Sequence, residues 1–205
     1  MAHISTIRHQ EIFDPTKFGA LPISIIGVGA TGSRVFASLV ELGCTNITLF
    51  DPDVVEAHNL ANQLFSHADI GRFKGEACLS WYHTKTGHDP KDISYIARYV
   101  PCEEAQPKGF VFLLTDSMSS RREIAEACFR NNPDVLHVFE TRMASSYGNV
   151  FNFNPMFDLD AWLATLTSDE EAEVSACGSS ISVGPTASII ANLAVWQFID
   201  RKSVV

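Results

Sequence analysis

The chain has 205 residues, of which 46% are hydrophobic and 19% are charged. A chain of this length and composition can bury a substantial core, so a disordered chain, a fibrous repeat and a small disulfide-stapled protein are excluded. The 24 acidic residues outnumber the 15 lysines and arginines, and the formal net charge of −9 argues against broad electrostatic binding of nucleic acid.

Five cysteines are scattered along the chain without a Cys-x-x-Cys pair. Such pairs hold structural zinc, so no zinc is expected. The first residues carry no cationic segment followed by an apolar run, so we expect no signal peptide, reduced thiols and a cytoplasmic location. Residues 174–199 lack charged side chains, but the first half is rich in Ser and Gly. This composition favours a loop followed by a buried helix over a membrane span.

Strand and helix patterns alternate along the chain. Apolar and β-branched runs predict strands at 22–28, 46–50, 93–99, 110–114, 135–139 and 149–153. Helical spacing of apolar residues predicts helices at 31–42, 58–65, 74–83, 121–130 and, after Pro185, at 189–199. Residues 156–176 are predicted to form an acidic loop. The alternation predicts an α/β fold over residues 1–205, with a Rossmann-like mostly parallel sheet, added antiparallel strands and helices on both faces.

A glycine-rich sequence separates the first predicted strand from the first predicted helix. Gly27, Gly29 and Gly32 form a Gly-x-Gly-x-x-Gly pattern, and Asp51 ends the second strand nineteen residues later. Glycine allows a tight turn and a close approach of phosphate, and a helix amino end offers unpaired N–H groups to an anion. A carboxylate at position 51 can accept hydrogen bonds from ribose hydroxyls. The pattern predicts nucleotide binding without separating NAD from ATP, although such loops also occur for packing alone.

The sequence after Asp51 distinguishes between these nucleotides. It contains Asp-Pro-Asp-Val-Val from residue 51, His-Asn-Leu-Ala-Asn-Gln from residue 58, Asp-Ile-Gly-Arg-Phe-Lys from residue 69, Leu-Leu-Thr-Asp at 113–116 before Arg121, Thr-Arg-Met at 141–143, and Cys177 eight residues before Pro185. These sequences resemble the ubiquitin-activating-like adenylyltransferase family, in its ThiF/MoeB/HesA branch. The resemblance runs in order from residue 5 to residue 200.

The resemblance implies which residues bind the nucleotide. They are Gly27, Gly29, Gly32, Asp51, Asp53, Asn59, Asn62, Lys74 and Asp116. In this scheme Asp51 holds the ribose, Asn59 and Lys74 contact the triphosphate, and Asp116 positions Mg²⁺ bound to ATP. Two plainer interpretations remain open from the residues alone: Lys74 is one lysine beside a helix start, and Asp116 is a simple N-cap of the helix that contains Arg121.

The implied reaction is ATP- and Mg²⁺-dependent adenylation of a carboxylate. By the resemblance, the carboxylate is the C-terminal glycine of a small ubiquitin-like or sulfur-carrier protein. The carboxylate attacks the α-phosphorus, so the site must hold the reactants in line and neutralise charge on the phosphates. Lys74 and Asp116 suit that task and are candidate catalytic residues.

Arginine placement departs from the family pattern. Asn62 stands where the family has a phosphate-binding arginine, and Arg34, Arg72 and Arg121 are candidate substitutes. Arg8 resembles an N-terminal arginine that the family inserts across a dimer interface, so it is a candidate catalytic residue of a homodimer. The loss of arginine at position 62 supports an alternative, a non-catalytic nucleotide-binding or scaffold protein. A NAD-dependent oxidoreductase is supported only by the glycine sequence and the acid after the second strand.

Two further features fall near the end of the chain. Cys177 aligns with a cysteine that in some relatives takes part in sulfur or acyl transfer, so it is a candidate catalytic residue; a buried structural cysteine is the alternative. The acidic segment 156–176 lies where the family has a crossover beside the path of a partner's C-terminal tail. It is a candidate gate or an unstructured connection.

Overall fold

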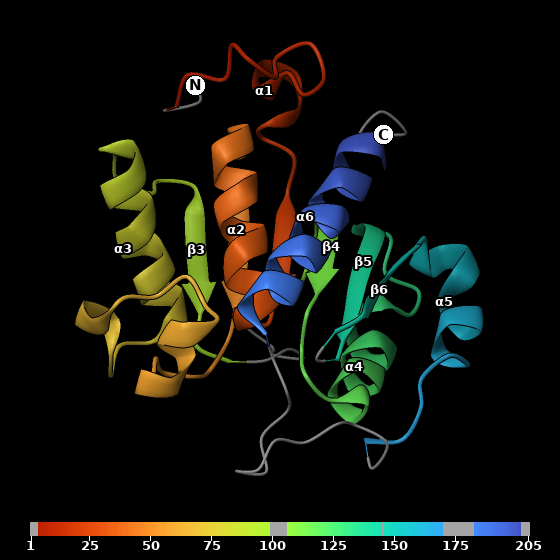
Figure 1. Ribbon diagram of the computed structural model, residues 1–205. Helices are drawn as coiled ribbons and strands as arrows, with labels where there is room; N and C mark the ends of the chain where they lie inside the picture. The colour runs from red at the N-terminus through yellow and green to blue at the C-terminus, as the bar shows by residue number, and fades with distance from the viewer. Residues whose placement is uncertain (1–3, 99–105, 145, 170–182, 202–205) are drawn as a thin grey trace.

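The computed structural model describes residues 4–98, 106–144, 146–169 and 183–201, and its centre is a six-stranded sheet (Figure 1). The strand order is β3-β2-β1-β4-β5-β6. The strands are β1 (Ile23–Ile26), β2 (Ile47–Phe50), β3 (Ile93–Ile96), β4 (Gly109–Leu113), β5 (Val135–Met143) and β6 (Gly148–Phe153). All neighbouring strands pair in parallel except β5 and β6, which are antiparallel. The predicted Rossmann-like, mostly parallel sheet is therefore confirmed.

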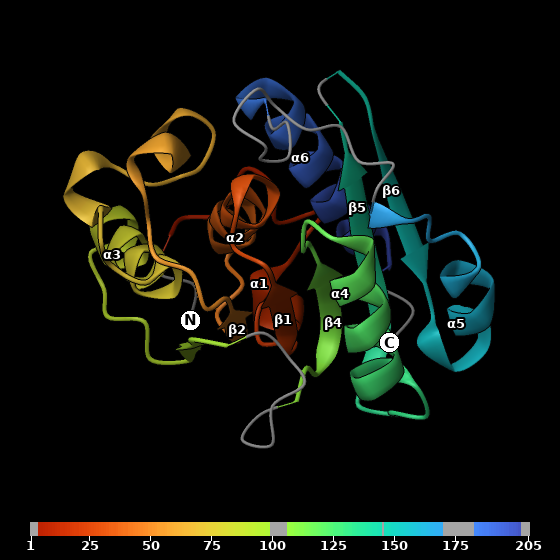
Figure 2. The same ribbon diagram turned by 90° about the horizontal axis from the view of Figure 1, so that it is seen from below.

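Helices cover both faces of the sheet (Figure 2). They are α1 (Pro15–Phe18), α2 (Ala30–Leu42), α3 (Lys74–Thr86), α4 (Met118–Ile124) with a π turn at Ala125–Phe129, α5 (Pro155–Leu163) and α6 (Gly184–Arg201). A cluster of buried hydrophobic side chains on one face of the sheet joins it to α2, α3 and α6. A second such cluster on the other face joins it to α4 and α5. Ile25 of β1 belongs to the first cluster and its neighbour Ile26 to the second. Burial on both faces explains why the central strands are continuous apolar runs in the sequence.

The structure differs from the sequence prediction in two segments. The helix expected at 58–65 is a 3₁₀ turn, η1 (Ala57–Ala61), with a second 3₁₀ turn, η2 (His67–Asp69), after it. The loop expected at 156–176 is wrong in its first part, because that part belongs to α5. The Asn154 side chain accepts the Met156 N–H at 2.9 Å, Pro155 occupies the first turn, and Trp162 is buried against the sheet. Residues 170–176 lie outside the described part.

In the described part of the chain, no helix is both long enough and apolar enough to cross a lipid bilayer.

A buried carboxylate organises the packing of α4 and α5 on β5. Glu140 is 0% exposed, and both of its oxygens accept hydrogen bonds from Arg142 Nε, at 3.2 and 3.0 Å. Trp162 Nε1 of α5 donates to the same carboxylate at 3.2 Å. Arg121 of α4 forms an ion pair with it at 3.2 Å and donates to the Thr141 carbonyl at 3.0 Å. Because buried charges are costly unless paired, these contacts fix the two helices against the sheet.

Removing this carboxylate should destabilise the fold. We expect Glu140→Ala to lower the free energy of unfolding by about 3–5 kcal/mol, since it leaves Arg121 and Arg142 without their acidic partner. Glu126→Ala removes an exposed carboxylate that pairs with Arg130 on the surface, and it should leave stability near that of the wild type. Urea denaturation of both variants measures the difference. Equal effects would show that the Glu140 network contributes no more than a surface pair.

Candidate functional site

The glycine turn and Asp51, together with Asp53 and Lys74, lie where the order of the strands reverses. β1 is flanked by β2 on one side and by β4 on the other, so the chain leaves the sheet in opposite directions at their carboxyl ends. Figure 2 looks toward this edge, with η1 and α3 on one side of α2 and α4 on the other. Ligands of open α/β sheets bind in the crevice at such a switch point.

The three glycines between β1 and α2 differ in their surroundings. Gly27 has a φ of +90°, and a Cβ there would lie 2.8 Å from the Leu114 carbonyl oxygen. A Cβ on Gly32 would lie 1.9 Å from the Gly27 oxygen, whereas one on Gly29 would meet nothing within 4 Å. The turn and its packing therefore require Gly27 and Gly32. Gly29 is the N-cap of α2 and faces open space, which suits the approach of a phosphate to backbone N–H groups.

Asp51 ties the glycine turn to the segment that follows β2. Its side chain accepts the Val28 N–H at 2.6 Å and the Asp53 N–H at 2.8 Å, and the residue is 2% exposed. Burial raises the pKa of this carboxyl group, while the Lys74 charge and the two backbone N–H groups act to lower it. The structure thus gives Asp51 a positioning role. Its expected contact with ribose stays a prediction.

Lys74 and Asp53 form a close ion pair beside this carboxylate. Lys74 is the first residue of α3, and its side chain is 8% exposed. Its Nζ lies 2.8 Å from an oxygen of Asp53, and its backbone N–H donates to the Asp53 carbonyl at 2.9 Å. Because the Asp53 side chain is half-exposed and the Lys74 side chain is buried, the ion pair holds the Lys74 ammonium group just below the surface.

Asn59 completes a hollow of about 380 Å³ around this ion pair. Residues that line it are Pro52, Asp53, Val54, Glu56, His58, Asn59 and Lys74. Asn59 is buried, and its Oδ1 accepts the Glu56 N–H at 2.9 Å, which shapes the η1 turn. Asn62 ends the same turn. The expected contacts of both amides with a triphosphate remain predictions.

Asp116 is exposed in the turn after β4, next to the glycine turn. The preceding Thr115 N would lie 3.1 Å from a Cβ on Gly27. The N-cap of α4 is Ser117, whose side chain accepts the Ser120 N–H at 3.1 Å. The simple capping role considered for Asp116 is therefore wrong. No hydrogen bond or ion pair of the Asp116 side chain is present among the described residues, so it is available to a ligand.

The remaining arginines are placed differently. Arg121 donates to the Thr115 and Thr141 carbonyls and pairs with Glu140, so its guanidinium is occupied within the fold. Arg72 pairs with Asp69 at 3.5 Å. Arg8 is exposed in the segment before α1, and this segment lies at the edge of the sheet opposite the carboxyl ends of the strands (Figure 1). The expected role of Arg8 across a dimer interface stays a prediction.

The cysteines divide into buried and undescribed residues. Cys44, Cys78 and Cys128 are buried, and burial raises the pKa of the Cys44 and Cys78 thiols. Cys177 lies outside the described residues. Within the described part of the chain, no group of three or more His, Cys, Asp or Glu side chains is arranged to hold a metal ion.

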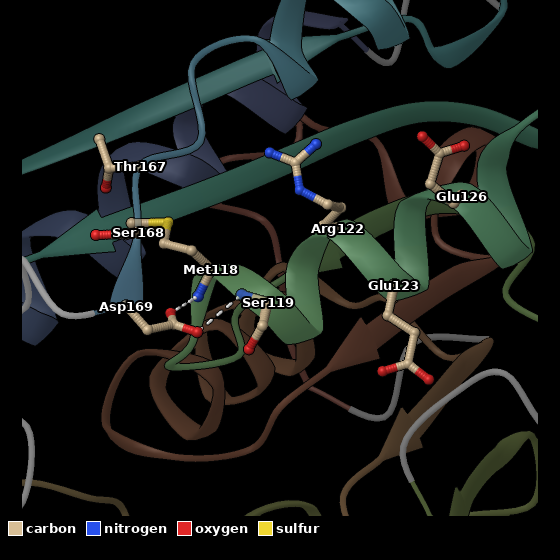
Figure 3. Close-up of a pocket in the computed structure, with 8 residues that line it drawn as sticks. All are labelled: Met118, Ser119, Arg122, Glu123, Glu126, Thr167, Ser168 and Asp169. Atoms are coloured by element: carbon tan, nitrogen blue, oxygen red, sulfur yellow. Dashed lines mark hydrogen bonds between the residues drawn. The ribbon is translucent and has the colours of Figure 1, made fainter.

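A second hollow of about 380 Å³ lies between α4 and residues 167–169 (Figure 3). Here Asp169 accepts the N–H groups of Met118 and of Ser119, the latter at 3.2 Å. A side-chain hydrogen bond from Ser119, followed by these backbone bonds, holds the pKa of Asp169 below its usual range. Sequence reasoning missed this contact, because no local pattern links residues fifty positions apart. Since the carboxylate already satisfies the amino end of α4, the hollow offers little to an anion.

The sequence matches the ThiF family over residues 14–86, which confirms the family resemblance for that part of the chain. No curated protein matches the chain significantly.

Three solved structures share the fold. E. coli MccB, solved with AMPCPP and MccA, is 15% identical with a TM-score of 0.69, and the match covers 98% of this chain and 65% of that one. PaaA is 16% identical with a TM-score of 0.70, over 95% and 59% of the two chains. E. coli tRNA N6-threonylcarbamoyladenosine dehydratase, TcdA, is 15% identical with a TM-score of 0.65, over 97% and 91%. The chain therefore spans less than two thirds of the length of MccB and PaaA.

The glycines provide a matched pair of substitutions. Gly32→Ala should lower the free energy of unfolding by at least about 2 kcal/mol, because its methyl group overlaps backbone. Gly29→Ala should keep stability within about 1 kcal/mol but weaken ATP binding at least about tenfold, because its methyl group occupies the open space before α2. Thermal unfolding and calorimetric titration measure the two effects. Unchanged ATP binding by Gly29→Ala would contradict the assignment of that space to a phosphate.

Proposed function

We propose that this chain, which matches the ThiF family over residues 14–86, binds ATP at the carboxyl edge of its sheet and adenylates a carboxylate. The observation that carries the proposal is the convergence at the strand switch point of Lys74, paired at 2.8 Å with Asp53, and the open glycine turn. Asp51 joins these two parts through its backbone hydrogen bonds. Asp116 adds an accessible carboxylate from the neighbouring strand.

Each group has a defined task in this reaction. The N–H groups at the amino end of α2 bind phosphate oxygens. Lys74 exchanges Asp53 for the phosphates and neutralises charge as the substrate oxygen bonds to the α-phosphorus and pyrophosphate leaves. Asp116 is the residue that would hold Mg²⁺, with phosphate oxygens of ATP as further ligands. The ion, when bound, neutralises phosphate charge.

The proposed substrate is the C-terminal carboxylate of a small ubiquitin-like or sulfur-carrier protein. This part of the proposal rests on the family resemblance, and the structure of MccB with MccA offers a parallel for an enzyme solved with its partner. Cys177 is proposed to act only after adenylation, in a transfer step.

A homodimer is part of the proposal. The segment that contains Arg8 lies at the edge of the sheet opposite the glycine turn (Figure 1), so we expect Arg8 to serve a nucleotide only across an interface. α6 supports such an interface, because Ile189, Leu193 and Trp196 are exposed at i, i+4 and i+7 on one stripe of the helix.

Asn62 favours a second candidate function, a nucleotide-binding scaffold without catalysis. An asparagine can donate a hydrogen bond to a phosphate but brings no charge. If charge at position 62 is indispensable, the chain binds ATP and releases it unchanged.

ATP–pyrophosphate exchange tests the proposal directly. With a small ubiquitin-like protein ending in Gly-Gly as the carboxylate donor, we expect exchange, and we expect Lys74→Ala or Asp116→Ala to reduce it at least about 100-fold. Lys85→Ala is the matched control, since Lys85 lies on the same helix and pairs with Glu41 on the surface. ATP binding without exchange would support the scaffold. Displacement of ATP by NAD would refute both functions and support the oxidoreductase.

A further inference from the structure

Arg34 of α2 has a guanidinium group without a partner in the described part of the chain. The residue is half-buried, its Nε is buried, and no acceptor lies within hydrogen-bond distance of that atom. Buried donors are paired in nearly all folded proteins, because an unpaired one loses its hydration without compensation. The Arg34 guanidinium therefore calls for an acceptor from outside the described chain.

The guanidinium lies beside position 62, where the family pattern has its arginine. A Cβ built on Gly184 would be 3.9 Å from Arg34 Nη2 and 3.5 Å from Asn62 Cα, so the two residues flank the same point. The Leu64 N–H donates to Ser33 Oγ at 3.2 Å, which attaches the segment after Asn62 to α2 next to Arg34. Both contacts place the positive charge of Arg34 near position 62, where the family pattern has an arginine and this chain has Asn62.

The electrostatic surroundings favour an anion at this point. α2 and α6 lie side by side with their amino ends at the same edge of the sheet (Figures 1 and 2), and Ser38 Oγ donates to Asn192 across them at 3.0 Å. Helix amino ends carry partial positive charge, so a cation beside two of them is destabilised unless an anion binds. Side chains of a helix lean toward its amino end, which directs Arg34 toward the glycine turn.

We infer that Arg34 binds the triphosphate of ATP and supplies the positive charge that Asn62 lacks. This inference rests on the proposed nucleotide site and assigns it a residue outside the family pattern. Arg34 on α2 and Lys74 on α3 then bring two cations to the phosphates from separate helices. An arginine fork gives paired hydrogen bonds to phosphate oxygens, which a lysine in its place would not reproduce.

Calorimetric titration of Arg34→Ala with ATP and with adenosine tests the inference. We expect the dissociation constant for ATP to rise about 10- to 100-fold and that for adenosine to stay within about twofold, because adenosine has no phosphate. Adding Asn62→Arg to Arg34→Ala should restore ATP binding to within about threefold of the wild type. Arg201→Ala, at the other end of α6, is the matched control and should leave both constants unchanged.

Thermal unfolding without nucleotide separates binding from a structural role. Since its guanidinium has no partner in the described chain, Arg34→Ala should unfold at the wild-type temperature or above it. A lower unfolding temperature together with unchanged ATP binding would overturn the inference and make Arg34 a structural residue. Equal loss of ATP and adenosine binding, or failure of Asn62→Arg to rescue, would also overturn it. Absence of ATP binding by the wild-type chain would instead refute the proposed function, and the inference with it.

Discussion

The buried carboxylate of Asp51 is the constraint on which the site depends. Its hydrogen bonds to the Val28 and Asp53 N–H groups join the end of β1 to the end of β2. The bond to the Val28 N–H holds the glycine turn. The bond to the Asp53 N–H holds the residue that forms the ion pair with Lys74. Because burying a carboxylate is costly unless it is hydrogen-bonded, the two bonds that position Asp51 also compensate its burial at 2% exposure.

Positive groups and carboxylates meet at this edge of a chain whose net charge is −9. Lys74, Arg34 and the amino ends of α2 and α6 are the positive groups, and they face the carboxylates of Asp51, Asp53 and Asp116. Arg121 does not contribute, because Glu140 and two carbonyl groups occupy its guanidinium. In the proposed site, Lys74 and Arg34 supply positive charge to a triphosphate, although the overall charge of the chain is unfavourable for polyanions. This arrangement also bears on the choice between an enzyme and a scaffold. If Arg34 supplies the positive charge at position 62, Asn62 no longer argues against catalysis.

The sequence predicted the parts of the fold that depend on local pattern. The central strands were recognisable because burial on both faces makes them continuous apolar runs, and the glycine turn was recognisable because its backbone excludes other residues. The start of α5 differs from the prediction because the acidic residues of this segment favour a loop, whereas the Asn154 cap and Pro155 are local signals for a helix. The contacts of Glu140 with Arg121 and of Asp169 with α4 join distant residues, and no periodicity encodes them. The capping of α4 by Ser117 rather than Asp116 likewise depended on backbone geometry.

A crystal structure of the chain with bound ATP tests the central claim most directly. The account predicts that the triphosphate lies against the Gly29 N–H at the amino end of α2, with Lys74 Nζ within hydrogen-bond distance of phosphate oxygens and no longer on Asp53. It also predicts that Asp51 keeps both of its backbone hydrogen bonds. A triphosphate bound elsewhere, or one bound here while Lys74 remains paired with Asp53, would contradict the account.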